Sequence, residues 1–168
     1  MSTRAESLGT VSIFGGLSAE ALGFLDQRLE PIDVPAGTRF FAEGDLGDSV
    51  FVLESGRAEV SKSRGAIELV LAFVEPGCCF GEVALIGICP RTASVRALTD
   101  CRALKLSNRV LLELYRRHPE QFTLVQMNLG REIARRLSDL NDALLDLASE
   151  AAEDGDVELA QRLGSIVK

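Results

Sequence analysis

The feature that most limits the fold of this chain is a series of short β-type runs, separated by glycines, between residues 31 and 107. The runs read PIDV, TRFF, VFVLE, RAEVS, IELVLAFV, SVRAL and CRALKL. The turns between them carry Gly37, Gly44, Gly47, Gly56, Gly65 and Gly77. Strands this short, at this spacing, are typical of a β-sandwich or β-barrel and not of a parallel α/β sheet.

Helical patterns lie on both sides of this β-region. One helix is expected within residues 17–29, with Ser18 placed to cap its start. A short helix is expected in residues 107–118, and Pro119 suits the first turn of a longer helix. We expect the long helix to end at EDGD, residues 153–156, and to be followed by at most a short, acidic helix.

The long helix contains a heptad repeat. Ile133, Leu137, Leu140, Leu144 and Leu147 alternate spacings of four and three residues. The repeat covers about two heptads, whereas a coiled coil is identified by three or four. These leucines can therefore pack on a second copy of the helix or on the chain's own β-domain.

Length and charge narrow the class of protein. The chain has 168 residues, enough for one full core with a helical appendage. Its 18 basic and 25 acidic residues give a net charge of -7, which disfavours nucleic acid as a partner. No apolar run is long enough to span a membrane, and MSTRAESLGT lacks the apolar core of a signal peptide. We therefore expect a cytoplasmic protein without membrane contact.

Neither a metal site nor a catalytic site is predicted. The four cysteines lie among apolar neighbours, the pair Cys78–Cys79 is not a CxxC motif, and His118 is the only histidine. Reduced cysteines in a core explain this pattern best. No acid–base dyad or nucleophile with an adjacent base is evident, so we expect a protein that is not an enzyme.

The run FGEVALIGICPRTASV, residues 80–95, carries the candidate site. Glu82 and Arg91 bracket eight uncharged residues, most of which look like core. A strand, Gly81 and a short helix would aim backbone N–H groups at an anion, and Arg91 can grip a phosphate with two hydrogen bonds. Glu82 suits a ligand hydroxyl such as that of ribose. These features indicate a nucleotide site; a structural ion pair between Glu82 and Arg91 is the alternative.

The same run resembles the phosphate-binding cassette of the cyclic-nucleotide-binding domain family. The family pattern, FGE followed after a short apolar helix by PRxA[ST]V, is met at Phe80, Gly81, Glu82, Pro90, Arg91, Ala93, Ser94 and Val95. Upstream, PAGTRFFAEGDLGDSVFVLESG is similar to the family's glycine-punctuated strands. The resemblance covers roughly residues 12–148.

The resemblance implies the fold. We expect a mainly β protein with flanking helices, namely an eight-stranded jelly-roll β-barrel with an N-terminal helix and two C-terminal helices, the last one long. Residues 1–11 would form an N-terminal tail. Residues 12–150 would form the cyclic-nucleotide-binding domain, including the C-terminal lid or dimer helix, and residues 151–168 an acidic tail or short helix.

The resemblance also implies roles for individual residues. Arg91 would pair with the cyclic phosphate, Glu82 would accept from the ribose 2′-hydroxyl, and the backbone of Gly81 and Ala93 with the hydroxyl of Thr92 would complete the cradle. The other expected ligand contacts are Phe80, Val83, Ala84 and Pro90 in the cassette and, for the base, Arg136 and Asn141 on the long helix.

The function implied is a regulatory module that binds cAMP or cGMP, requires no cofactor, and responds by moving its C-terminal helix. A homodimer through that helix and an unknown downstream protein would be its partners. Thr92 stands where cGMP-dependent kinases carry a threonine that bonds the guanine 2-amino group, although proteins that respond to cAMP also have threonine there. Two alternatives are an interaction or scaffold domain with another or no ligand and, less favoured by the acidic tail, a DNA-binding regulator.

Overall fold

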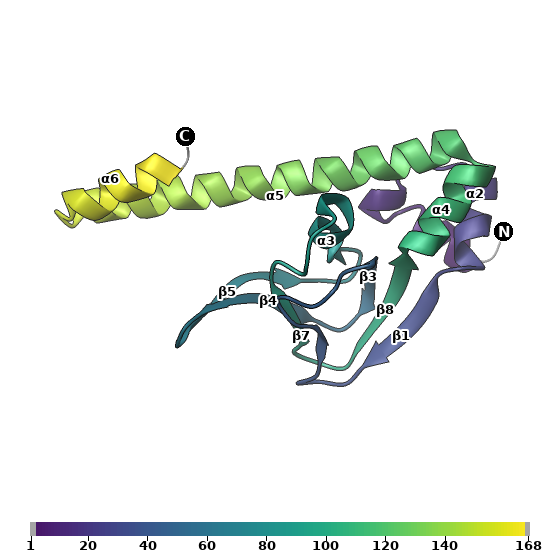
Figure 1. Cartoon of the computed structure of the whole chain (residues 1–168), viewed down its shortest axis with the longest axis horizontal. Coiled ribbons are helices and arrows are strands. Elements are labelled where there is room, and N and C mark those ends of the chain that lie inside the picture. Colours follow the sequence, from purple (N-terminus) through teal and green to yellow (C-terminus); the bar gives the residue numbers. More distant parts are fainter. Residues whose placement is uncertain (1–2, 167–168) are drawn as a thin grey trace. The chain divides into compact units, whose positions relative to one another are not determined.

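The computed structural model describes residues 3–166 (Figure 1). Its helices are α1 (Thr3–Leu8), the 3-10 helix η1 (Ser12–Phe14), α2 (Ala19–Asp26), α3 (Glu82–Gly87), α4 (Asn108–Arg117), α5 (Pro119–Glu153) and α6 (Val157–Ile166). Its strands are β1 (Glu30–Val34), β2 (Arg39–Phe41), β3 (Ser49–Ser55), β4 (Ala58–Arg64), β5 (Ile67–Val74), β6 (Cys79–Phe80), β7 (Ser94–Ala97) and β8 (Cys101–Ser107). The chain divides into two compact units, and the boundary lies within α5, between Leu129 and Gly130.

The strands form two four-stranded antiparallel sheets, with the orders β1-β8-β3-β6 and β2-β7-β4-β5. Each of the seven predicted runs contains a strand, and β6 lies in the apolar stretch just before the cassette. The predicted eight-stranded jelly roll with flanking helices is confirmed.

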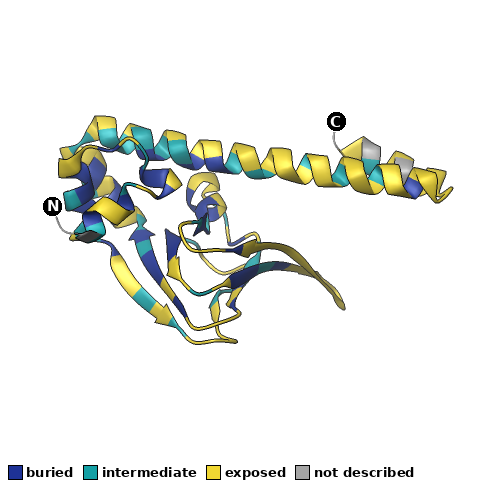
Figure 2. Ribbon diagram, turned by 180° about the vertical axis from the view of Figure 1, so that it is seen from behind, coloured by how far each residue is buried: buried dark blue, intermediate teal, exposed yellow. Residues whose placement is uncertain are grey.

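Strand β3 links the two parts of the hydrophobic core because both of its faces are buried. Val50 and Val52 face the N-terminal helices, whereas Phe51 and Leu53 face the space between the sheets. A strand covered on both sides needs apolar residues at every position, which explains the unbroken run VFVL. In contrast, β5 is an edge strand, and all of its residues except Val74 are exposed (Figure 2).

The predicted helix starts are also confirmed, whereas α2 ends at Asp26, before Leu29. The Ser18 hydroxyl accepts a hydrogen bond from the Ala21 N–H at the start of α2, and the Ser107 hydroxyl accepts one from the Val110 N–H at the start of α4. Helix α5 begins at Pro119 and ends within the EDGD segment. The sequence did not predict α1 or η1, although η1 places fully buried side chains in the core.

The first turns of α5 are fixed to the N-terminal helices within the first compact unit. The Asn128 side chain donates to the carbonyl of Gly15 at 2.9 Å, and the Gln121 side chain accepts from the Ser18 N–H at 2.7 Å. Val125 and Leu129 are fully buried. Polar and apolar contacts therefore anchor this end of the helix.

The second compact unit comprises the rest of α5 and helix α6. Gly155, with a φ of 83°, makes the turn between them, and Ala151 is buried near the end of α5. Of the predicted heptad positions, Leu137, Leu140 and Leu147 are exposed. Within the described residues, no helix is both long enough and apolar enough to cross a membrane.

Candidate functional site

The predicted cassette is built from β6, α3 and the loop that leads to β7. Gly81 lies between β6 and α3 with a φ of 82°, a left-handed conformation that glycine adopts without strain. A Cβ at this position would lie 2.6 Å from Nη1 of Arg91. Both the backbone turn and the close approach of the arginine thus require glycine.

Arg91 is only 5% exposed and is held from several sides. Its Nη1 donates to the carbonyl oxygens of Ser49 at 2.9 Å and Gly81 at 2.8 Å, and its guanidinium lies 4.1 Å above the ring of Phe41. Nε is buried and donates no hydrogen bond within the described part of the chain. A buried donor of this kind is costly unless a ligand satisfies it.

The backbone of Arg91 is fixed as well. Its N–H donates to the carbonyl of Asp45 and its carbonyl accepts from the N–H of Gly44, both at 2.8 Å. The loop before β3 therefore lies directly against the cassette. Gly47 makes this approach possible, because a Cβ there would lie 2.5 Å from Cβ of Ala84 and 3.0 Å from Nε of Arg91.

Three acidic residues influence the pKa of Arg91. Burial lowers the pKa of its guanidinium, and Asp48, Asp45 and Glu82 oppose that shift. Because the ordinary pKa of arginine lies far above neutral pH, the side chain remains a cation. Glu82 is 2% exposed at the first position of α3, so the site presents one buried cation and one buried carboxyl group.

The other cassette residues divide between the core and the surface. Phe80 and Ala84 are buried, Ala93 is half-buried, and Pro90 and Thr92 are exposed. The expectation that the run between the two charges is core was wrong for three side chains, because Val83 is 38%, Ile86 41% and Ile88 93% exposed. A helix of six residues turns only part of its surface inward, so half of a uniformly apolar run faces outward.

Two supports of Arg91 were missed by sequence reasoning. Phe41 provides the ring under the guanidinium, and the carbonyl of Ser49 accepts one of its hydrogen bonds. Both come from strands distant in sequence from the cassette. The sequence predicts Gly47 only as a turn residue. The signal for its role is its place beside Asp48 in GDLGDS.

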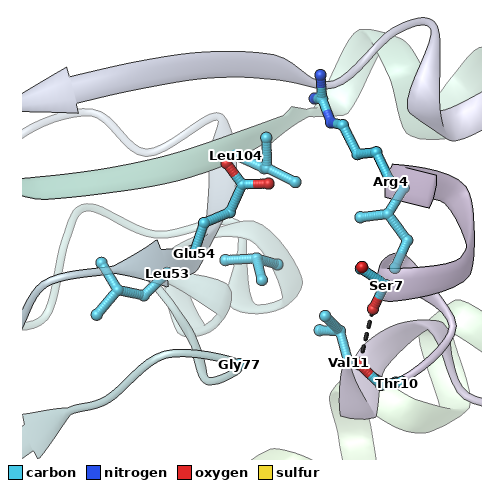
Figure 3. A pocket seen from close by; sticks show the side chains of 10 residues that line it. Arg4, Ser7, Thr10, Val11, Leu53, Glu54, Gly77 and Leu104 are labelled. Carbon is cyan, nitrogen blue, oxygen red and sulfur yellow. Dashed lines mark hydrogen bonds between the residues drawn. The ribbon is translucent and has the colours of Figure 1, made fainter. Parts of the chain in front are cut away.

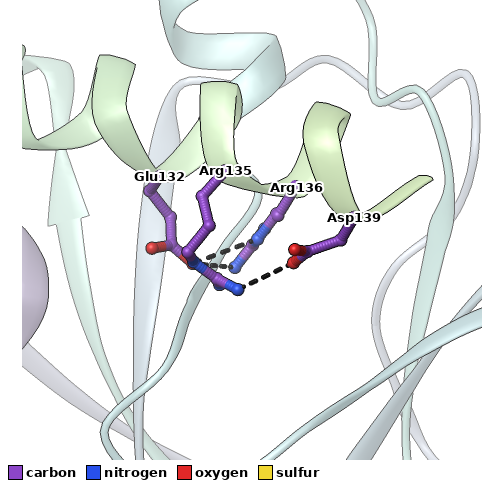
Figure 4. A network of polar contacts seen from close by, with 4 residues as sticks. All are labelled: Glu132, Arg135, Arg136 and Asp139. Atoms are coloured by element: carbon purple, nitrogen blue, oxygen red, sulfur yellow. Dashed lines mark hydrogen bonds and ion pairs between the residues drawn. The ribbon is translucent and has the colours of Figure 1, made fainter. Parts of the chain in front are cut away.

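The predicted base contacts, Arg136 and Asn141, lie on α5 in the second compact unit. There, Oε1 of Glu132 accepts hydrogen bonds from Arg135 at 2.7 Å and from Arg136 at 3.2 Å, and Arg135 also pairs with Asp139 (Figure 4). Burial raises the pKa of Glu132, but the hydrogen bonds and charges of the two arginines outweigh it and leave the pKa lowered. Arg136 is thus tied to its own helix.

A separate cavity of about 300 Å³ lies between α1 and the strands β3 and β8 (Figure 3). Its charged groups already have partners: Arg4 pairs with Asp26 at 3.2 Å, and Glu54 with Arg102 at 3.3 Å. No cassette residue lines it. Among the residues that the structure covers, no group of His, Cys, Asp or Glu could hold a metal ion.

Comparisons with known proteins agree with this geometry. The family model for the cyclic nucleotide-binding domain matches residues 31–118. A CRP-like cAMP-activated global transcriptional regulator of Mycobacterium tuberculosis is 32% identical over 143 residues, which are 84% of this chain and 62% of the relative. A cAMP-dependent protein kinase regulatory subunit of Aspergillus niger is 42% identical over 99 residues, 59% of this chain and 24% of that protein.

A solved structure has the same fold. The Thermus thermophilus catabolite activator protein matches with a TM-score of 0.70 and 34% identity, over 82% of this chain and 63% of that chain. The chain therefore spans about three fifths of the length of these bacterial relatives. Because the family model covers more than half of its residues, the chain belongs to the cyclic nucleotide-binding domain family.

Proposed function

We propose that the chain is a regulatory module that binds cAMP or cGMP at the cassette. The observation that carries this proposal is the buried guanidinium of Arg91, whose Nε has no hydrogen-bond acceptor in the described chain. Gly81 and Gly47 keep the space around it clear. A cyclic phosphate would supply the missing acceptor. Relatives whose names include cAMP support this class of ligand.

The cassette residues take complementary roles in this proposal. Arg91 binds the phosphate, Glu82 accepts from the ribose 2′-hydroxyl, and Thr92 with the backbone of Gly81 and Ala93 completes the cradle. Arg136 and Asn141 contact the base from α5. Arg136 must then leave or share its bond with Glu132, so base contact has an energetic cost. No residue is assigned a catalytic role.

The proposed output passes through α5. Its first turns are anchored by Asn128 and Gln121, whereas Leu137, Leu140 and Leu147 present apolar side chains to solvent. We propose that these leucines pair with a second copy of the helix and that nucleotide binding changes the helix position. A downstream protein would read this change.

Calorimetry on the full chain tests the ligand class. cAMP, cGMP and linear 5′-AMP are titrated in parallel into the unmodified protein and into Arg64→Ala, an exposed arginine on β4 that serves as a control. Both cyclic nucleotides should bind both proteins, and 5′-AMP should bind much more weakly. Equal affinity for 5′-AMP, or no binding of either cyclic nucleotide at millimolar concentration, would refute the proposal.

A further inference from the structure

A groove between α4 and the first turns of α5 lies outside the proposed nucleotide site. It has a volume of about 350 Å³ and belongs entirely to the first compact unit. Its lining residues are Asn108, Leu111, Leu112, Tyr115, Phe122 and Gln126. Tyr115 and Phe122 meet edge to face across the two helices, with ring centroids 5.3 Å apart.

The groove has an apolar floor and exposed apolar walls. Leu111 is buried and Phe122 half-buried, whereas Leu112 is 47% and Tyr115 53% exposed. Two large apolar side chains beside a recess form a surface that a partner can cover, unlike apolar residues scattered singly. A groove between two helices has the shape that accepts the apolar face of a third helix.

The rim of the groove is basic. Arg109 and Arg116 lie one turn before and one turn after Leu112 on α4, and the Arg109 side chain is 85% exposed. Glu113, the acidic residue of this helix, pairs with Arg28 at 3.0 Å and more loosely with Arg109 at 3.9 Å. Residues 105–126, which span the groove, contain four basic residues and two acidic residues, in a chain of net charge -7.

Helix stability accounts for only part of this arrangement. Arg116 and Arg117 lie in the last turn of α4, where a positive charge compensates the helix dipole. Arg109 lies in the first turn, where a positive charge is unfavourable, and its ion pair with Glu113 has the less favourable order along the helix. The dipole gives no reason for Leu112 and Tyr115 to be exposed. Recognition of an acidic, apolar partner accounts for the two exposed arginines, Arg109 and Arg116, and for the exposure of Leu112 and Tyr115.

We propose that this groove binds an acidic amphipathic helix of a partner protein. Leucine or aromatic side chains of that helix enter the recess beside Leu112 and Tyr115, and its flanking carboxylates pair with Arg109 and Arg116. The contact is small, so binding is weak on its own, and we expect a dissociation constant in the micromolar range or above. The proposal does not depend on the nucleotide site being occupied.

A defined peptide tests the groove on the full chain. The probe is a capped synthetic peptide with leucines at i, i+3, i+4 and i+7 and glutamates on its other face. One control peptide replaces the glutamates with lysine and another replaces the leucines with serine. Binding is followed by fluorescence anisotropy and by amide shifts in NMR spectra. Only the acidic, leucine-containing peptide should bind, with shifts concentrated in residues 108–126.

Matched variants separate charge from apolar contact. Arg109→Glu combined with Arg116→Glu should weaken peptide binding at least about tenfold, since two attractive pairs become repulsive. Leu112→Ser should weaken it by a similar factor. The controls, Arg39→Glu with Arg64→Glu and Leu46→Ser, alter exposed residues on other elements and should leave binding unchanged.

Several results would overturn the proposal. Equal binding of the lysine peptide would show that charge does not select the partner, and shifts outside α4 and the first turns of α5 would place the contact elsewhere. No binding at millimolar peptide would refute it outright. A lower sedimentation coefficient for Leu112→Ser than for the unmodified chain would assign the groove to a second copy. Binding to anionic vesicles but not to the peptide, lost with the two arginines, would assign it to a lipid surface.

Discussion

The carbonyl oxygen of Gly81 accepts a hydrogen bond from Nη1 of Arg91, and any side chain at Gly81 would project into that same nitrogen. Gly81→Ala should therefore both strain the left-handed turn and displace the guanidinium. The strain alone costs roughly 1–2 kcal/mol. Chemical denaturation should show a loss of about 1–3 kcal/mol in unfolding free energy, and titration should show weaker cyclic-nucleotide binding.

Gly130→Ala is the matched control, and its effect should have the opposite sign. Gly130 lies in the interior of α5, and a Cβ there would have no neighbour within 4 Å. Alanine in a helix interior is more favourable than glycine by about 0.5–1 kcal/mol. A loss of stability in Gly130→Ala, or none in Gly81→Ala, would contradict this account of the two glycines.

Arg91 should contribute most of the phosphate affinity. A charge-assisted hydrogen bond contributes roughly 1.5–3 kcal/mol, and a phosphate left without a partner in a closed site costs more. Arg91→Ala should weaken cyclic-nucleotide binding by on the order of a hundredfold, measured by calorimetry. Arg91→Lys should recover only part of the loss, since lysine cannot donate two parallel hydrogen bonds. Full affinity in a folded Arg91→Ala protein would exclude this role.

The β-region was predictable because its signals are local. Gly37, Gly56 and Gly77 each have a positive φ. The glycines that separate the β-type runs in the sequence are therefore also the residues that these turns require. The pairing of β1 with β8 is different, because it joins segments at opposite ends of the domain. No local signal in the sequence indicates that partner.

The sequence indicated which residues form the candidate cassette but not the groups that support Arg91. Glu82 and Arg91 stand out in sequence because each is a charge beside an apolar run. The ring of Phe41 and the carbonyl of Ser49 have no such signal, since every strand residue has a carbonyl and aromatic side chains are common in strands. Ile88 could not be placed from its apolarity, because it ends α3 in a left-handed conformation and points to solvent.

Thr92 should distinguish the two cyclic nucleotides. Its side chain is on the exposed loop directly after Arg91. If its hydroxyl also bonds the guanine 2-amino group, cGMP gains one neutral hydrogen bond that adenine cannot form. That bond is worth roughly 0.5–1.5 kcal/mol, so the preference is at most about tenfold. Calorimetry of Thr92→Ala should show a larger loss for cGMP than for cAMP. Equal losses of affinity for the two nucleotides would show that Thr92 contacts the phosphate and does not contact the base.

Leu140 should be required for self-association. It is exposed in the single chain and lies in the middle of the predicted heptad repeat. Leu140→Glu would bury a charge between paired helices, so sedimentation should show a monomer. Ser138→Glu adds the same charge at an outward heptad position and should leave the dimer intact. A monomeric unmodified protein at tens of micromolar, with and without nucleotide, would disprove the dimer.

Glu132 should make the second half of α5 sensitive to acid. Its pKa is lowered in the folded chain, so its stabilising effect is present above the unfolded pKa and is lost as the pH falls through the folded value. The loss of stability should appear below pH 4.5, the ordinary pKa of a glutamate. It should amount to less than about 1 kcal/mol, because the arginines that pair with Glu132 are partly exposed. Hydrogen exchange of residues 131–140 should show it, and Glu132→Gln should abolish it. An unchanged acid response in Glu132→Gln would show that Glu132 is not the source of the acid sensitivity.

The register of β1 on β8 also has a consequence for biosynthesis. Glu30 pairs with Lys105, so β1, the first strand to leave the ribosome, must wait for β8, the last strand, before its sheet can close. Until then β1 and β3 lack the strand that lies between them, whereas the other sheet, β2-β7-β4-β5, contains no part of β8 and can form earlier. Such long-range pairing slows folding and prolongs the exposure of strand edges. A nascent chain stalled before Ser107 should therefore keep the edges of β1 and β3 exposed and bind chaperones more than the folded protein does.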